Sequence, residues 1–161
     1  MEQLPRTLLL LRGPTCSGKS FFVQHDLQDI RVKSVYSTDD FFMIDGEYIF
    51  DSDKLSLYHE MNLRRCVMAM EKLEPFIVID NTHLQAWELC PYVHAAMKHG
   101  YQIQLQSMPK LPLHILQKRN LERGKKSGKL IPEEVLAHHH SIYNEELSLA
   151  EIVQYCQDED N

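Results

Sequence analysis

An eight-residue segment near the start of the chain has the residue types and spacing of a phosphate-binding loop. Its sequence, GPTCSGKS at residues 13–20, matches G-x-x-x-x-G-K-[ST] and follows a run of leucines typical of a buried strand. Glycines let the backbone curl so that successive N–H groups face phosphate oxygens, and the following helix adds the positive end of its dipole. The segment predicts binding of a nucleoside triphosphate, with a structural glycine turn as the alternative.

Each residue of this loop has an expected task. Lys19 should reach the β- and γ-phosphates, and the Ser20 hydroxyl should ligate Mg²⁺. The residues expected to bind the nucleotide from this loop are Gly13, Cys16, Ser17, Gly18, Lys19 and Ser20.

Two carboxylates are expected at the same edge of the sheet as the loop. Asp39 comes directly after a predicted strand, where it could accept the proton of a substrate hydroxyl that attacks the γ-phosphate. Asp40, its neighbour, could instead cap the following turn. Asp80 ends another apolar run, FIVI, and is a candidate for the Mg²⁺ site together with Ser20. For both Asp39 and Asp80 the alternative is a purely structural loop carboxylate.

A basic segment near the C-terminus could close over the triphosphate. Arg119 and Arg123 are spaced i, i+4 on one helical face, and lysines follow them. Guanidinium groups placed on the transferring phosphoryl group would stabilise its charge, and Gly124 and Gly128 suit a mobile lid. The alternative is an exposed basic helix end. A second helix carries further polar groups that could reach an acceptor phosphate: His59, Asn62, Arg64 and Arg65.

Length and composition limit the classes of protein that fit. The chain has 161 residues and a net charge of −6, which fits a single domain and argues against a nonspecific nucleic-acid coat. No apolar run is long enough for a membrane span, and we expect no membrane partner. The four cysteines are widely spaced, so we expect reduced thiols and an intracellular location, cytoplasmic or nuclear. We expect one kinase domain over residues 1–150 and an acidic, frayed tail over residues 151–161.

Strands that alternate with helical stretches predict parallel strands with helical crossovers. Strands are expected at about residues 7–12, 32–37, 76–79 and 101–106. Helices are expected at about residues 19–27, 52–73, 86–99 and 112–123, with a loop over 124–131 and a last helix from Pro132. The pair Asp45-Gly46 between apolar residues favours a small hairpin. The expected fold is a three-layer α/β/α P-loop sandwich with a parallel sheet of four to five strands and a C-terminal helical lid.

Five sequence blocks together resemble a known family. They are LRG…GKS at 11–20, YSTDDFF at 36–42, DGEYIF at 45–50, VIDNTHLQAWE at 78–88 and KRNxxRG at 118–124. The chain is similar to P-loop polynucleotide 5′-hydroxyl kinases over about residues 7–145, and most similar to the branch of Nedd-four-binding protein two-like proteins. The later blocks are more distinctive than the phosphate loop alone.

The resemblance implies an activity and roles for particular residues. The reaction would move the γ-phosphate of ATP, or of another nucleoside triphosphate, onto a 5′-hydroxyl end of RNA or DNA, which would be the partner of the protein. Lys19 and Ser20 would hold ATP and Mg²⁺, Asp39 would be the general base, and Arg119 and Arg123 would be the basic pair of the lid. By this resemblance the catalytic residues are Asp39, Lys19 and Arg123.

The chain departs from the family pattern at two positions. Cys16 stands where family loops usually carry glycine. Phe42 stands where phage-type members carry an arginine that contacts the acceptor phosphate, so acceptor recognition must differ. Phe41 or Phe42 could stack on a terminal base, or either could be a core residue. A kinase of a small hydroxyl metabolite or nucleoside, and a nucleotide-gated binding module with little catalysis, are the alternative functions. The sequence leaves the oligomeric state open.

Overall fold

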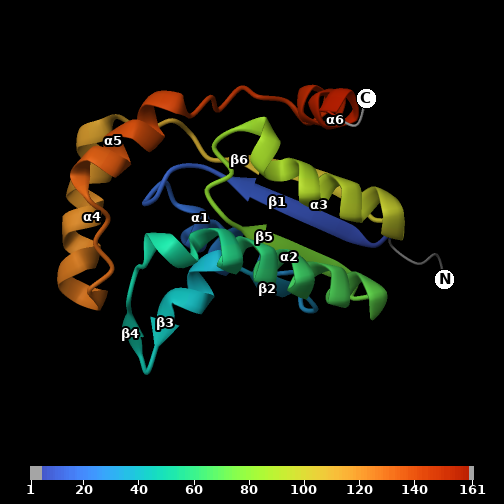
Figure 1. Cartoon of the computed structure of the whole chain (residues 1–161), viewed down its shortest axis with the longest axis horizontal. Coiled ribbons are helices and arrows are strands. Elements are labelled where there is room, and N and C mark those ends of the chain that lie inside the picture. Colours follow the sequence, from blue (N-terminus) through green and yellow to red (C-terminus); the bar gives the residue numbers. More distant parts are fainter. Residues whose placement is uncertain (1–4, 160–161) are drawn as a thin grey trace.

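The protein, described here from a computed structural model over residues 5–159, is built on a sheet of four parallel strands. The strands are β1 (Thr7–Arg12), β2 (Ser34–Tyr36), β5 (Phe76–Asp80) and β6 (Gln102–Ser107), in the spatial order β2-β5-β1-β6 (Figure 1). The central strand β1 is buried along its whole length because it has a strand on each side and residues packed on both faces. The parallel α/β fold with flanking helices is confirmed.

Helices connect the strands and extend beyond the sheet. They are α1 (Lys19–Phe21), which continues as a π-helical turn over Phe22–Asp26, then α2 (Leu55–Glu71), α3 (Ala86–His99), α4 (Leu113–Ser127), α5 (Glu133–Ile142) and α6 (Leu149–Glu159). The expected hairpin is present as β3 (Met43–Ile44) and β4 (Glu47–Tyr48) around Asp45-Gly46. In residues 5–159, no helix combines the length and the apolar character needed to cross a bilayer.

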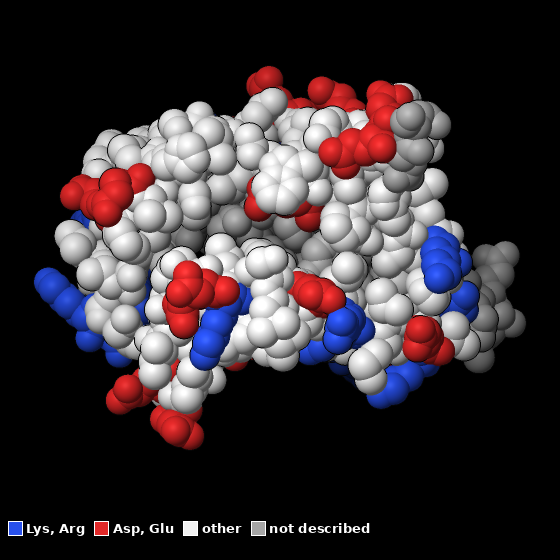
Figure 2. Space-filling model, viewed as in Figure 1, with Lys and Arg blue, Asp and Glu red and all other residues white. Residues whose placement is uncertain are grey.

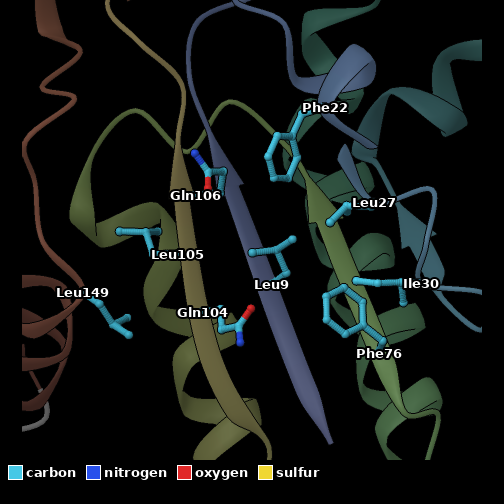
Figure 3. Close-up of a pocket in the computed structure, with 9 residues that line it drawn as sticks. All are labelled: Leu9, Phe22, Leu27, Ile30, Phe76, Gln104, Leu105, Gln106 and Leu149. Atoms are coloured by element: carbon cyan, nitrogen blue, oxygen red, sulfur yellow. The ribbon is translucent and has the colours of Figure 1, made fainter. Parts of the chain in front are cut away.

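The two faces of the sheet are covered unequally. Alternate residues such as Leu8 and Leu10 face the main core, which α2, α3 and α6 complete. Leu9, Leu11 and Val78 point to the opposite face and pack against the turn that follows the phosphate loop. There β6 presents glutamines, and a shallow hollow of about 650 Å³ lies beside Leu9 (Figure 3).

Several element boundaries differ from those expected. Helix α3 spans Ala86–His99 and ends at Gly100 in the left-handed conformation, as predicted. In contrast, α4 continues through Gly124 to Ser127, so Gly124 is not a hinge. A Cβ atom at Gly124 would lie 3.1 Å from the Leu130 side chain, which would have to shift by a few tenths of an ångström, so α4 and the loop after it pack closely at this glycine. Gly128, with φ +74°, ends the helix.

The expectations for the C-terminus and for the cysteines were wrong. Residues 149–159 form helix α6, which packs on α3 and buries Ile152 and Cys156, so most of the expected tail is ordered core-facing structure. Asp160 and Asn161 lie outside the described residues. Cys90 and Cys156 form a disulfide between α3 and α6, with Cα atoms 5.3 Å apart, whereas Cys16 and Cys66 are free. Their separation of 66 residues carried no sequence signal, because only the docking of α6 brings them together.

A fully buried arginine fixes the carboxyl end of the sheet. Arg12, the last residue of β1, donates through Nε to the His83 carbonyl at 3.1 Å and through Nη2 to the Leu84 carbonyl at 3.0 Å. Its Nη1 donates to Ser107 Oγ at 3.1 Å and to the Asn144 carbonyl at 2.6 Å. Burial lowers the pKa of Arg12, and the guanidinium also lies 4.7 Å from the centre of the Tyr143 ring. One side chain therefore joins the loops after β5 and α5 to the end of β6.

We predict that Arg12→Met lowers the free energy of unfolding by about 3–5 kcal/mol, because the buried carbonyls that it serves lose their donors. Chemical denaturation followed by circular dichroism measures this loss. Arg31→Met, a change at an exposed arginine, is the control and should alter stability by less than about 0.5 kcal/mol. Equal stability of the two variants would contradict a structural role for Arg12.

Candidate active site

The phosphate loop closes between β1 and α1 with little free space around its first glycine. The Gly13 N–H donates to the Thr82 carbonyl at 2.8 Å, and a Cβ atom at Gly13 would lie 2.5 Å from Ser17 Oγ. Gly18 has φ +106° and precedes the first turn of α1. Cys16 has φ +68°, a left-handed conformation that glycine adopts without strain. The usual glycine of related loops at this position thus has a backbone reason.

Lys19 folds back onto its own loop. Its Nζ donates to the carbonyl oxygens of Gly13 at 2.7 Å and Pro14 at 3.0 Å. Burial lowers the pKa of Lys19 to about 8, although Asp80 and Asp39 oppose this shift. Burial also raises the pKa of Asp80, which Lys19 partly offsets. Lysine and aspartate are therefore close enough to influence each other at the floor of the site.

Asp39 lies in a short 3-10 turn, Thr38–Phe42, directly after β2. Ser37 caps this turn, and Asp40 accepts a hydrogen bond from the Ser37 N–H at 3.4 Å, so the capping role expected for Asp40 is confirmed. Arg65 on α2 holds the same turn by donating to the Ser37 carbonyl at 2.8 Å and to Asp40 Oδ2 at 3.1 Å. With its neighbour committed to the turn, Asp39 is free to face the lid.

The carboxylate of Asp39 meets two side chains from other elements. Lys129, in the loop after α4, forms an ion pair with Asp39 Oδ2. The Tyr48 hydroxyl of strand β4 donates to Asp39 Oδ1 at 3.3 Å, and Lys129 Nζ also lies 4.9 Å from the centre of the Tyr48 ring. Burial and the neighbouring Asp39 raise the pKa of Tyr48, so it remains a hydrogen-bond donor at neutral pH.

Contacts from α4 join the predicted lid to the phosphate loop and to the loop that follows the helix. Arg119 donates through Nη1 to the Cys16 carbonyl of the phosphate loop at 3.1 Å. Arg123 donates through Nε to the Lys129 carbonyl at 3.0 Å. The buried Asn120 side chain donates to the Ile131 carbonyl at 2.8 Å and accepts from the Ile131 N–H at 3.1 Å. The loop that carries Lys129 is thereby fixed to the helix that carries the arginines.

A single cleft of about 930 Å³ collects most of the predicted site. The predicted residues that line it are Cys16, Gly18, Lys19, Ser20, Asp39, Asp80, Arg119 and Arg123. Gly13 and Ser17 are buried behind it and shape the loop. The face of the molecule shown in Figure 2 is hollowed between α5 and α2, and acidic side chains gather over α6. Ser20 and Asp80 supply oxygen donors of the kind Mg²⁺ prefers, and the buried carboxylate of Asp80 would gain from a cation.

Most of the polar candidates on α2 do not face this cleft. Arg64 pairs with Glu60 at the surface, whereas Asn62 is buried and donates to the Tyr92 hydroxyl at 3.0 Å. Arg65 serves the Asp40 turn, and among the four candidates His59 lines the cleft, next to the Thr38 hydroxyl at 3.1 Å.

Neither phenylalanine of the 36–42 block is placed to stack on a substrate. Phe42 is 1% exposed and packs in the core, and Phe41 is covered by the Arg65 guanidinium, 4.4 Å from the ring centre.

The contacts of three residues could not be read from the sequence. Tyr48 and Lys129 meet Asp39 across 9 and 90 residues of chain, and Asn120 meets Ile131 across 11 residues. Tyr48 and Asn120 do lie inside the blocks DGEYIF and KRNxxRG, which was the one available signal. Tyr48 meets Asp39 because the hairpin folds back on the turn after β2, and Lys129 meets it because the loop after α4 lies against that turn.

Comparison with known proteins agrees with this fold. The AAA domain family model matches residues 8–145. Human NEDD4-binding protein 2 is 47% identical over 96 residues, which are 60% of this chain and 5% of that protein. A chain of the Pnkp1/Rnl/Hen1 RNA repair complex has a TM-score of 0.72 at 22% identity, over 98% of this chain and 47% of that one. A gluconokinase from Sinorhizobium meliloti has a TM-score of 0.56 at 15% identity, over 96% and 91%.

These likenesses confirm the resemblance to the P-loop kinases and to the Nedd-type branch. This chain spans less than half of the RNA-repair chain and a small part of the human relative. The structural matches, each under 25% identical, show a P-loop kinase fold, which is a nucleotide-binding fold.

We predict that nucleotide binding takes up a proton at pH 8–9. Free Lys19, whose pKa is about 8, is largely neutral above that pH, and phosphate groups favour its charged form. Affinity should therefore fall as pH rises through 8. Calorimetry in buffers of different ionisation enthalpy measures the uptake. Lys19→Met should abolish it and Lys54→Met, at an exposed lysine, should not; proton release by the wild type would contradict the assignment.

Proposed function

We propose that this chain, which belongs to the AAA domain family, transfers the γ-phosphate of ATP to the 5′-hydroxyl end of a nucleic acid. The observation that carries the proposal is the shared cleft of Lys19 and Asp39, closed by the lid that bears Arg119 and Arg123. A phosphate-binding lysine needs no such carboxylate to bind a nucleotide. A carboxylate at this place fits the activation of an acceptor hydroxyl. The likeness to a chain of an RNA repair complex supports a nucleic-acid acceptor.

In the proposed reaction, the acceptor oxygen attacks the γ-phosphorus as its proton passes to the carboxylate of Asp39. The bond between the γ-phosphorus and the bridging oxygen breaks, and the nucleoside diphosphate leaves with that oxygen. The ion pair with Lys129 occupies part of Asp39 Oδ2, so an acceptor hydroxyl would compete with Lys129 for this oxygen. Tyr48 can keep its hydrogen bond to Oδ1 and thus hold the carboxylate in position.

Positive groups of this chain would stabilise the charge that develops on the transferred phosphoryl group. Lys19 must leave the carbonyls of Gly13 and Pro14 to reach the phosphates, and Arg119 must release the Cys16 carbonyl. Arg123 binds the carbonyl of Lys129, so its positive charge would move together with the lid loop. Bound Mg²⁺, held by Ser20 and Asp80, would neutralise phosphate charge.

A kinase of a small hydroxyl compound is the second candidate. The observation that favours it is the position of the positively charged side chains that line the cleft. They belong to the phosphate loop, to α4 and to the loop after α4. Among residues 5–159, the hairpin, α2 and α5 contribute no lysine or arginine to the cleft lining for an acceptor phosphate. The gluconokinase likeness shows that the fold also occurs in a kinase of this second type.

We predict that Asp39→Asn lowers turnover on the order of 10²–10⁴-fold and leaves ATP affinity nearly unchanged, because the amide cannot accept the proton. Transfer of labelled phosphate to 5′-hydroxyl oligonucleotides measures turnover, and a metabolite panel tests the second candidate. Asp40→Asn is the matched control, since asparagine also caps turns. Wild-type turnover in Asp39→Asn would remove this residue from the mechanism.

A further inference from the structure

The acceptor side of the cleft has an apolar wall next to Asp39. Met43 and Phe50 from the hairpin region line the cleft and are 50% and 48% exposed. Leu130 and Val135, from the lid loop and α5, line the same cleft and are also exposed. Large apolar side chains left open beside polar catalytic groups are characteristic of ligand sites. Lys129, the cation that contacts the hairpin at Tyr48, is already paired with Asp39.

Phe50 is held firmly although one face is open. Its ring centre lies 5.1 Å from that of Phe42, which is buried and in turn makes an edge contact with Tyr58 at 4.7 Å. The Ile49 N–H donates to the Phe42 carbonyl at 2.8 Å, which fixes the backbone just before Phe50. A rigid half-exposed ring loses little conformational freedom on binding, so it suits stacking.

Phe50 is also tied to the reacting group. Tyr48, two residues earlier, donates to Asp39 and belongs to the hairpin that brings Phe50 to the cleft. Because Asp39, Met43 and Phe50 line the same cleft, the group that adjoins an alcohol bound at Asp39 can meet the apolar wall. A nucleoside carries a planar base next to its primary hydroxyl, which matches an aromatic ring and apolar neighbours on a hairpin that contributes no lysine or arginine to the cleft lining.

We propose that Phe50, with Met43 beside it, stacks on the base of the acceptor's first nucleoside. The acceptor is thus selected by its terminal nucleoside and not by its backbone phosphates. This inference rests on the proposed transfer to a 5′-hydroxyl and assigns the specificity of that site to residues outside the phosphate loop and lid arginines. A free nucleoside and an oligonucleotide end share the recognised chemistry.

The test compares three acceptors: a 5′-hydroxyl RNA hexamer, the same hexamer with an abasic first residue, and a free nucleoside. Wild type, Phe50→Ala and Ile49→Ala are assayed with labelled ATP, and thermal melts confirm that the variants fold. Ile49 is 47% exposed next to Phe50 but does not line the cleft, so its variant should behave as wild type.

We expect the abasic end and Phe50→Ala each to raise KM for the hexamer about tenfold, without a further rise when they are combined, because both remove one stacking contact. The KM for ATP should not change. The free nucleoside should have a KM within about threefold of that of the hexamer, since backbone phosphates add little by this proposal.

Other results separate the inference from the proposed function. If Phe50→Ala raises KM no more than Ile49→Ala does, the stacking site is overturned and the kinase activity stands. The same holds if the effects of Phe50→Ala and of the abasic end on KM multiply when they are combined. A free nucleoside whose KM is far higher than that of the hexamer would overturn selection by the terminal nucleoside. If the wild type phosphorylates none of the acceptors, binding is measured with a non-hydrolysable ATP analogue. Base-dependent binding lost in Phe50→Ala would then retain the site and refute the reaction, and its absence would refute both.

Discussion

The buried guanidinium of Arg12 is the interaction on which the arrangement of the site depends. A buried charge is tolerated only where its donors are satisfied, and here four acceptors from two loops and a strand end meet it. Arg12 directly precedes Gly13, so the same contacts set where the phosphate loop begins and where the chain after β5 turns away. Asp80 is the last residue of β5, directly before that second segment. The packing of one structural side chain thus helps to place both the phosphate loop and the end of the strand that carries Asp80.

The closed lid is stabilised by groups that the proposed reaction would need elsewhere. Lys19, Arg119 and Lys129 each bind a backbone carbonyl or carboxylate of the chain itself. A triphosphate would offer the first two stronger, charged acceptors, and an acceptor hydroxyl would compete with the third. These contacts satisfy the polar groups in the free protein. Substrate binding would replace them with contacts to the substrate, and this replacement would couple binding to a rearrangement of the lid.

Local sequence signals predicted the parts of the structure that depend on near neighbours. Helix α3 with its Gly100 cap, the Asp45-Gly46 hairpin and the Asp40 turn all follow from residue types within a few positions. The Cys90–Cys156 disulfide did not, because only the docking of α6 on α3 brings the two cysteines together. Helix α6 itself had local signals that the expected tail passed over: Ser148 and Glu151 form a capping box, and Ile152, Val153 and Cys156 lie on one helical face. The partners of Asp39 could not be predicted either, because they meet it only in the folded chain. Most of the site residues predicted from the sequence do line one cleft.

Cys16 shows how the loop combines a local cost with a wider constraint. A side chain in the left-handed conformation costs about 1–2 kcal/mol relative to glycine, so the rest of the loop must impose this geometry. The constraint is visible on both sides: Gly13 has no room for a Cβ atom, and the Cys16 carbonyl is held by Arg119 of the lid. The φ angle at Cys16 orients that carbonyl, which links the conformation of the phosphate loop to the position of α4. A residue in a strained conformation is therefore also the point at which α4 contacts the phosphate loop.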